Sequence, residues 1–402
     1  MATTQTTSRT RDILGASALR PDGVAKVTGE FSFSSDMRAE NMLWGATLRS
    51  PHPYARIKSI DTTKALLIPG VHAVITSEDV PGKLTYGLIS SDQPVFAKDV
   101  VRYMGEPIAA VAADQPETCR RALAAIVVEY DVMSPLVDAE IALLTSTPPI
   151  HPDGNVIRHQ RIVHGDPSAT GDIVVEGNYT VGMQDQAFLG LEAAMAFPDA
   201  GSQGVELHIA TQWLHEDRGQ IAACLNLPEN NVRLVLGGVG GAFGAREDIS
   251  LQVHCCLLAL RTGRPIKMQY SREESFFGHV HRHPATIFMR HHADANGKII
   301  KIDARFVFDG GAYTSTSPAV LINGITHTQG PYKCDNATVD GFAVRTNNPP
   351  CGAMRGFGVV QACFAHESQM DKIAAAVGKS PVEVRLINAM VTGDPLITGQ
   401  IM

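Results

Sequence analysis

The sequence predicts an α+β protein whose 402 residues form two domains. The first observation is size, because a chain of this length with 44% hydrophobic residues can bury more than one core. The second is a change of pattern from short strands with one clear helix over residues 18–136 to longer strands alternating with helices over residues 171–402. The third is the segment 137–170 between them, whose proline- and turn-rich run from Thr147 is typical of a linker.

The N-terminal residues 1–17 are polar and contain no apolar signal core, so we expect a flexible tail on a cytoplasmic protein. In the first domain, β-branched and alanine-rich runs predict strands over residues 71–76 and 108–113. Pro116, at a favoured first helical position, predicts a helix over 116–125 that leads into a further strand.

The second domain repeats strand and helix signals up to its end. Hydrophobic periodicity predicts strands over 207–210, 231–235, 265–270 and 289–309, with a turn at Asp294, and helices over 216–225, 249–260 and 359–377. Gly378 is expected just past the last of these helices, and the capping box that begins at Ser380 predicts another helix to about residue 391.

Charge and cysteine usage exclude several classes of protein. The formal net charge is −7 and no basic run of five residues occurs, which argues against binding to nucleic acid or to an anionic membrane surface. No stretch approaches the ~20 apolar residues that a spanning helix needs. The seven cysteines are scattered without any Cys-x-x-Cys pair, so we expect reduced, mostly buried thiols rather than an iron–sulfur or zinc site.

A glycine loop over residues 236–248 stands out. Five of the eight residues from Gly237 to Gly244 are glycine, which lets the backbone take positive φ and approach a ligand closely. The spacing fits neither the dinucleotide-binding pattern nor a P-loop, so a nucleotide-binding protein is the weakest alternative. Phe243, Arg246 and Glu247 put a ring, a cation and a carboxylate on one loop, which suits a planar polar substrate.

A second glycine loop, Ala353-Met-Arg-Gly-Phe-Gly, precedes the helix over 359–377 and also places Phe-Gly beside an arginine. The residues of both loops have structural interpretations as well. Glu247 could complement a helix dipole, Arg355 could support a loop carbonyl, and Phe243 and Phe357 could be core rings. The shared pattern favours a joint functional interpretation.

Three histidines alternate in His279-Val-His-Arg-His-Pro. On a strand this spacing would put all three on one face, where they could bind a metal. No carboxylate or cysteine lies nearby in the sequence to complete a site, so a polar, hydrogen-bonded strand face is the favoured interpretation and no metal ligand is assigned to a side chain.

Several separated stretches together resemble one family. Arg20-Pro-Asp-Gly-Val-Ala-Lys-Val-Thr-Gly, Leu48-Arg-Ser-Pro-His-Pro-Tyr-Ala-Arg-Ile and Val101-Arg-Tyr-Met-Gly-Glu-Pro-Ile-Ala are similar to the N-terminal a/b-hammerhead domain of the xanthine dehydrogenase and aldehyde oxidase family of molybdenum hydroxylases. Both glycine loops and the helix sequence Glu367-Ser-Gln-Met-Asp-Lys resemble the first part of that family's molybdopterin-binding domain. The resemblance covers residues from about 18 to the end, in the same order.

The resemblance implies hydroxylation of an electron-poor carbon with oxygen derived from water, at a molybdenum held by molybdopterin. The pterin could be the cytosine dinucleotide form. Electrons would leave through 2Fe-2S clusters to FAD, both on partner subunits.

The resemblance also implies roles for individual residues. Gln212 would donate a hydrogen bond to the metal's oxo ligand, Arg355 would be a polar contact near the metal, and Glu247 would face the substrate. The backbone of Gly241, Ala242, Phe243 and Gly244 would lie beside the cofactor, and the rings of Phe243 and Phe357 would contact a planar substrate. Without the family, Gln212 would be interpreted as satisfying a strand-end carbonyl.

Two departures from the family pattern matter. Members that act on xanthine carry an arginine where this chain has Asn323. Without that arginine, the chain lacks a positively charged partner for negative charge on a purine oxygen. Because Glu247 keeps the purine-like carboxylate, we expect a nitrogen heterocycle as substrate, with an aldehyde as the alternative. The family's catalytic glutamate lies in a C-terminal half that this chain lacks, so we expect a second molybdopterin-binding chain to carry it. A gene fragment, or a catalytically silent assembly subunit, is the competing interpretation.

Overall fold

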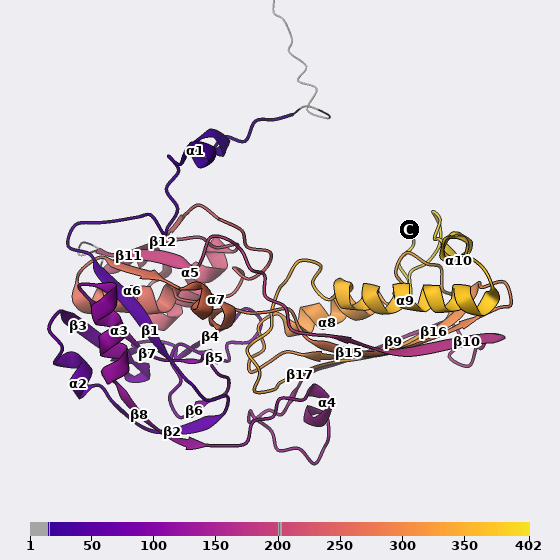
Figure 1. Ribbon diagram of the computed structural model, residues 1–402, viewed down its shortest axis with the longest axis horizontal. Helices are drawn as coiled ribbons and strands as arrows, with labels where there is room; N and C mark the ends of the chain where they lie inside the picture. Colours follow the sequence, from indigo (N-terminus) through magenta and orange to yellow (C-terminus); the bar gives the residue numbers. More distant parts are fainter. Residues whose placement is uncertain (1–14, 16, 200, 202) are drawn as a thin grey trace, which may run out of the picture.

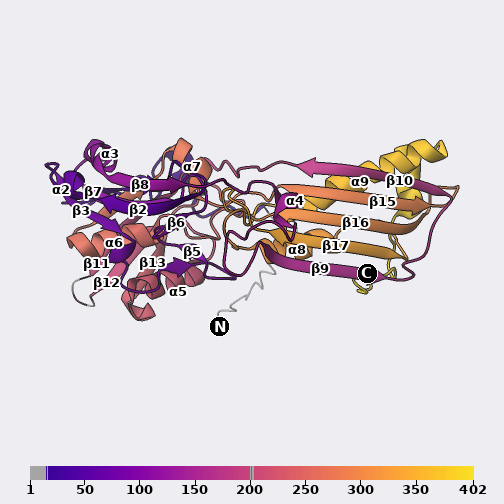
Figure 2. The ribbon, with the colours of Figure 1, turned by 90° about the horizontal axis from the view of Figure 1, so that it is seen from below.

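The computed structural model describes residues 15, 17–199, 201 and 203–402, so most of the predicted tail lies outside the described residues. The described chain forms two lobes placed end to end, joined by a region of crossing loops (Figures 1 and 2). One lobe is built on a seven-stranded sheet and the other on a five-stranded sheet. The α+β class predicted from the sequence is confirmed.

The seven-stranded sheet combines strands from both predicted domains. Its order is β13 (Val232–Leu236), β12 (Gly204–Ile209), β11 (Ala193–Asp199), β14 (Ile266–Gln269), β1 (Leu43–Arg49), β7 (Pro107–Ala113) and β3 (Val71–Thr76). β1 pairs with β14 in parallel and with β7 in antiparallel orientation, so the first domain adds three strands to a sheet that the second completes. The sequence boundary therefore does not coincide with the boundary between the lobes.

Every residue of β7 is buried, which shows that both faces of the sheet are covered at this strand. Ala110 and Ala112 belong to the core on the side of α6 (Gln252–Thr262), whereas Ala109 and Val111 pack with Ala122 of α3 (Pro116–Ala125). Small side chains at alternate positions let the helices approach the strand closely from both sides. The predicted helix 249–260 begins later, at Gln252, since residues 249–251 are not yet helical.

The second lobe is a five-stranded sheet with one face covered by α8 (Ser317–Thr326), α9 (Val359–Val377) and α10 (Pro381–Asn388) (Figure 1). Its order is β10 (Ile173–Val181), β15 (Ala285–Ala293), β16 (Ile299–Asp309), β17 (Ala337–Val344) and β9 (Val156–His164). Buried and partly exposed residues alternate along β15, as expected for a sheet covered on one side. α9, Gly378 with positive φ and the capping box at Ser380 match the predictions.

The segment 137–170 differs from the expected linker, because it contains α4 (Ala139–Ala142) and the whole of β9. β9 pairs with β17, and the register shifts where Ala343 lies opposite Arg158 and Val344 opposite Val156. The extra residue of this bulge interrupts the two-residue alternation by which strands are recognised in a sequence.

The remaining elements are mostly short, apart from one helix of 12 residues. They are β2 (Ala55–Asp61), β6 (Val100–Val101) and β8 (Val127–Val132) in a three-stranded sheet, β4 (Thr85–Tyr86) and β5 (Gln93–Pro94) in a two-stranded sheet, α1 (Gly23–Thr28), α2 (Thr63–Leu66), α5 (Leu214–Leu225), α7 (Arg272–Gly278), η1 (Ser77–Asp79) and η2 (Glu229–Asn231). Within the described residues, no helix combines the length and the apolar content that crossing a bilayer requires. All seven cysteines are free thiols and all but Cys363 are buried, as predicted.

Candidate active site

The first glycine loop starts at the carboxyl end of β13. β12 and β13 are parallel neighbours with Ile209 paired to Leu236, so the chain leaves both strands at the same edge of the sheet. The backbone N–H of Gly237 donates to the carbonyl of Ile209 at 2.8 Å, and the N–H of Gln212 donates to the carbonyl of Arg246 at 2.9 Å. The loop therefore folds back over the end of β12, where Gln212 meets it.

The side chain of Gln212 is oriented by the glycine loop. Its Oε1 accepts a hydrogen bond of 3.0 Å from the backbone N–H of Gly244, which only the oxygen of the amide can do. The Nε2 group then lies on the side of Glu247, with its nitrogen 3.4 Å from Oε1 of that carboxylate. Since this contact is long and Gln212 is exposed, the amide retains donor capacity for a ligand.

Glu247 is half-buried beside this amide, and burial raises the pKa of its carboxyl group above the usual value. Among the described residues, the amide of Gln212 is the one side chain that hydrogen-bonds to it. The group is thus partly desolvated without a neutralising cation, a state that favours interaction with a polar ligand.

Arg246 does not face the site, which corrects the expectation of a cation presented to substrate. It is buried, its Nε donates to the carbonyl of Gly241 at 2.9 Å and its Nη1 to that of Ala210 at 3.3 Å. Its guanidinium also lies over the ring of Phe188, 4.4 Å from the centroid. Because a guanidinium can donate five hydrogen bonds, one arginine is able to hold several turns of a glycine-rich backbone in place.

The next residue, Asp248, also points into the interior. It accepts a hydrogen bond of 3.0 Å from the hydroxyl of Ser315, and burial raises the pKa of its carboxyl group to about 7. The N-cap of α6 is Leu251, which makes no side-chain cap. Capping of α6 therefore does not explain Glu247 or Asp248.

The second glycine loop lies against the first. The backbone N–H of Arg355 donates to the carbonyl of Phe243 at 2.8 Å. Phe243 and Phe357 both adopt left-handed backbone conformations, with φ of 53° and 46°. Such conformations are unfavourable for aromatic residues and concentrate at functional sites.

The predicted site residues of the two loops differ in their exposure to solvent. Phe243 is 48% exposed. Arg355 is also exposed, and the guanidinium of Arg355 has no hydrogen bond or ion pair with the residues that the structure describes. Phe357 instead packs partly against the core of the second lobe. Asn323, on α8, donates from Nδ2 to the carbonyl of Phe357 at 2.7 Å, so it supports the loop in addition to lying near it.

A third wall of the site was not foreseen from the sequence. The segment 183–192, between β10 and β11, brings Gln186 to the second loop, where its Nε2 donates to the carbonyl of Ala353 at 2.8 Å. The N–H of Gly190 donates to the carbonyl of Gly240 at 3.0 Å, and a Cβ on Gly241 would lie 2.8 Å from Cβ of Phe188. The polar and glycine content after β10 was the available signal, but it indicates any loop equally well.

Three successive backbone donors of the first glycine loop are unpartnered among the described residues. The backbone N–H groups of Gly241, Ala242 and Phe243 have no hydrogen-bond partner in the described part of the chain. Together with Nε2 of Gln212 they form a set of donors suited to an oxygen-rich ligand.

The three histidines do not lie on one strand face, because β15 begins only at Ala285. The rings of His279 and His281 stack, with centroids 5.3 Å apart. His283 is separate, and its Nε2 lies 2.8 Å from the hydroxyl of Ser317.

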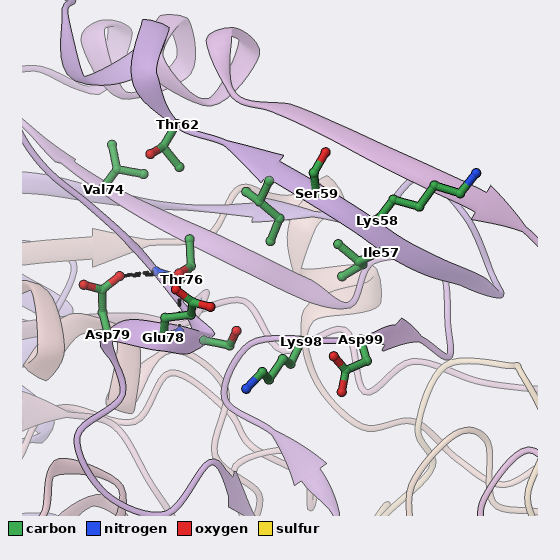
Figure 3. Close-up of a pocket in the computed structure, with 12 residues that line it drawn as sticks. Ile57, Lys58, Ser59, Thr62, Val74, Thr76, Glu78, Asp79, Lys98 and Asp99 are labelled. Carbon is green, nitrogen blue, oxygen red and sulfur yellow. Dashed lines mark hydrogen bonds between the residues drawn. The ribbon is translucent and has the colours of Figure 1, made fainter.

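A hollow of about 660 Å³ lies elsewhere, in the first lobe, and its lining includes Lys58, Glu78 and Lys98 (Figure 3). None of its lining residues belongs to the glycine loops or to segment 183–192. Asp79 in this hollow caps η1 through the N–H of Thr76, at 2.9 Å, so part of its polar surface is used locally. The unpartnered backbone donors and a half-buried carboxylate without a cationic partner among the described residues make the loop region the better candidate for chemistry.

Comparison with known proteins identifies the family to which the two domains belong. Residues 28–134 match the aldehyde oxidase and xanthine dehydrogenase a/b hammerhead domain, and residues 150–389 match a molybdopterin cofactor-binding domain. The chain is 39% identical to the nicotinate dehydrogenase large molybdopterin subunit of Eubacterium barkeri, over 97% of this chain and 92% of that protein. It is 38% identical to a probable xanthine dehydrogenase subunit of Bacillus subtilis, over 92% of this chain but 50% of that protein.

Solved structures of related enzymes have the same fold as this chain. The aldehyde oxidoreductase of Desulfovibrio gigas superposes with a TM-score of 0.91 at 29% identity, over 95% of this chain and 44% of that protein. Quinoline 2-oxidoreductase of Pseudomonas putida superposes with a TM-score of 0.90 at 29% identity, over 96% of this chain and 52% of that chain. The chain thus spans nearly all of one relative and about half of the others.

Proposed function

This chain belongs to the xanthine dehydrogenase and aldehyde oxidase family, and we propose that it forms one part of the active site of a multi-subunit molybdenum hydroxylase that acts on a nitrogen heterocycle. Its molybdopterin-binding domain includes both glycine loops. The residues in these loops fit such a cofactor, because the open N–H groups of Gly241, Ala242 and Phe243 offer donors to an oxygen-rich group.

A bound molybdenum cofactor supplies the redox chemistry, in which a C–H bond of the substrate becomes C–OH with oxygen from water, and two electrons and two protons leave. The chain's own contribution is to bind and orient. We assign to Nε2 of Gln212 a hydrogen bond toward the cofactor, since Gly244 orients that amide and the NH2 group keeps a second N–H beside its long contact with Glu247. The exposed guanidinium of Arg355 would place a positive charge on the same side.

The carboxyl group of Glu247 is the observation that carries the substrate class. It is partly desolvated, has no cationic partner among the described residues, and shares its loop with the half-exposed ring of Phe243. A ring nitrogen can exchange a hydrogen bond with such a carboxyl group while the flat heterocycle contacts the phenyl ring. Two relatives are named for nicotinate and xanthine, which supports a nitrogen heterocycle.

An aldehyde substrate is the second candidate, since the aldehyde oxidoreductase of Desulfovibrio gigas has the same fold. An aldehyde has no ring nitrogen for Glu247 to recognise. Asn323 offers no positive charge to an anionic purine oxygen and already holds the Phe357 carbonyl, so the proposal favours a heterocycle without requiring xanthine itself.

We further propose that the catalytic glutamate lies on a second molybdopterin-binding chain and that 2Fe-2S and FAD subunits accept the electrons. The support is the length, because this chain covers half of the Bacillus subtilis relative but 92% of a protein described as one molybdopterin subunit. The competing proposals are a fragment of a longer subunit and a catalytically silent assembly subunit.

The test is purification of the native complex through this chain, followed by metal analysis and turnover with an artificial electron acceptor. We expect molybdenum, iron and flavin in the complex, a copurifying second pterin-binding chain, and oxidation of nicotinate or purines in preference to aldehydes. Labelled water should place its oxygen in the product. A complex without molybdenum would refute the proposed enzyme, and preferential oxidation of aldehydes would refute the substrate class.

A further inference from the structure

Two buried histidines and one carboxylate converge behind the third wall of the site. Nε2 of His279 lies 3.0 Å from Oδ2 of Asp185, and Nε2 of His281 lies 3.5 Å from the same oxygen. One ligand atom from each of the three side chains falls within 4.8 Å of the other two. The carboxylate missing near the histidines in the sequence is therefore supplied from the loop after β10.

The contact between His279 and Asp185 has the distance of an ion pair but not the geometry of a hydrogen bond. Nε2 of His279 and Oδ2 of Asp185 have no hydrogen-bond partner among the described residues, although they are 3.0 Å apart, and the side chain of His279 is only 2% exposed. A buried polar atom without a hydrogen-bond partner destabilises the folded state. A cation between the two atoms would satisfy both.

The opposite side of each imidazole is arranged as it is in metal sites. Nδ1 of His279 lies 2.5 Å from Oε1 of Glu192, and Nδ1 of His281 lies 3.4 Å from the carbonyl oxygen of Pro350. Histidines that bind a metal through one nitrogen commonly donate from the other to a carboxylate or a backbone carbonyl, which fixes the tautomer and the ring orientation.

We propose that Asp185, His279 and His281 bind a divalent transition-metal cation of the zinc class, at a site separate from the molybdenum cofactor. With metal–ligand distances of roughly 2.1 Å, the ligand atoms of a tetrahedral site lie roughly 3.4 Å apart, close to the 3.0 and 3.5 Å that separate Oδ2 of Asp185 from the two Nε2 atoms. Nε2 of His281 is hydrogen-bonded to the carbonyl oxygen of Phe276 at 2.8 Å, and metal binding would replace the proton of that nitrogen and release the carbonyl oxygen as a fourth ligand. Imidazole nitrogen and carboxylate oxygen suit zinc and its first-row neighbours.

The cation would have a structural role. It would tie the segment 183–192 to the residues around His281, which form an isolated bridge to Cys351 just before the second glycine loop. The same segment carries Gln186 and Phe188, which contact the carbonyl of Ala353 and the backbone of Gly241. One ion would thus hold the third wall against both glycine loops.

Metal titration of the purified full-length chain tests the proposal directly. After removal of metals with a chelator, we expect Co²⁺ to bind with one equivalent, to give visible absorption bands of a four-coordinate site, and to be displaced by Zn²⁺. Zn²⁺ should also raise the thermal unfolding temperature, because a ligand that binds only the folded state stabilises it. A wild-type chain that binds no Co²⁺ and shows no thermal shift would overturn the proposal, leaving His279 as an imidazolium between two carboxylates.

Variants locate the ion. Asp185→Asn and His281→Gln should abolish the Co²⁺ bands, whereas His283→Gln, at an equally buried histidine that contacts Ser317, should retain them. Glu192→Gln should weaken binding about 10- to 100-fold, as expected for a residue that orients a ligand. Bands that persist in both Asp185→Asn and His281→Gln would place the ion elsewhere and refute the site. Molybdenum content is measured separately, so a failure here and a failure of the proposed enzyme are distinguishable.

Discussion

The backbone N–H of Arg355 donates a hydrogen bond of 2.8 Å to the carbonyl of Phe243, and this bond joins the two glycine loops across the boundary between the lobes. The contact is possible because Gly244 lies against the backbone of Ala353, where a Cβ would come within 2.4 Å of the Ala353 carbonyl oxygen. The candidate active site is therefore a product of close backbone packing between two segments that belong to different sheets.

Gly244→Ala should separate the loops. Besides the collision with Ala353, the residue has a φ of 109°, which alanine adopts only with strain. We expect a loss of roughly 3 kcal/mol or more in the free energy of unfolding, measured by denaturant titration, and loss of molybdopterin from the complex. The matched control is Gly263→Ala, which also has positive φ but meets no atom within 4 Å, and should cost roughly 1 kcal/mol. Equal losses in the two variants would contradict the proposed packing role.

Gln212→Glu should reduce turnover while leaving the cofactor bound. The variant can still accept the hydrogen bond from the N–H of Gly244, but it lacks the Nε2 donor and adds a negative charge beside Glu247. A lost donor at a reacting centre typically reduces kcat about 100-fold or more. Gln220→Glu is the control, since Oε1 of Gln220 likewise accepts from a backbone N–H, that of Gly87, at 2.9 Å. Unchanged kcat in the Gln212 variant would favour a silent assembly subunit.

Glu247→Gln should lower the activity toward heterocycles more than the activity toward aldehydes. Removal of a partly desolvated carboxyl group that pairs with a ring nitrogen should lower kcat/KM for the heterocycle about 10- to 100-fold, the range for one hydrogen bond to a charged group. Turnover of an aldehyde, which has no ring nitrogen, should change little. Glu216→Gln, at an exposed glutamate in the first turn of α5, serves as the control. If kcat/KM falls equally for both substrates, Glu247 does not recognise the ring nitrogen.

Asp248 should make stability depend on pH. Because burial raises its pKa to about 7 from an unfolded value of about 4, the folded chain holds one proton more than the unfolded chain between these two values. Its contribution to stability is therefore complete below pH 4, decreases as the pH rises toward 7, and is constant above. In Asp248→Asn this decrease, of a few kcal/mol, should disappear from urea unfolding curves recorded between pH 5 and 8.

The exposed Asp131 provides the comparison for that experiment, because Asp131→Asn changes an aspartate that lies at the surface. It should leave the pH profile of the wild-type chain in place. A profile that is the same in wild type and Asp248→Asn would show that the buried carboxyl group does not carry the proton.

The sequence by itself determined most of the secondary structure and the identity of the glycine loops. α3, α9 and β3 have the predicted bounds, because helices and regular strands repeat their apolar residues every 3.6 or 2 positions along the chain. The loop glycines were recognisable because a positive φ or a close backbone contact restricts the residue type at its own position. The family followed from the order of such local motifs, and domain matches over residues 28–134 and 150–389 agree.

Only the tertiary structure decided which side chains meet. The side chain of Arg246 hydrogen-bonds to its own loop rather than facing a ligand. The segment 183–192 forms a third wall of the site, and Asp185 contacts His279 from another part of the chain. The last two contacts have no local signal, because they join residues far apart in sequence whose encounter depends on how the chain is packed. That packing also brings the N–H of Arg355 to the carbonyl of Phe243, a contact that neither glycine loop specifies alone.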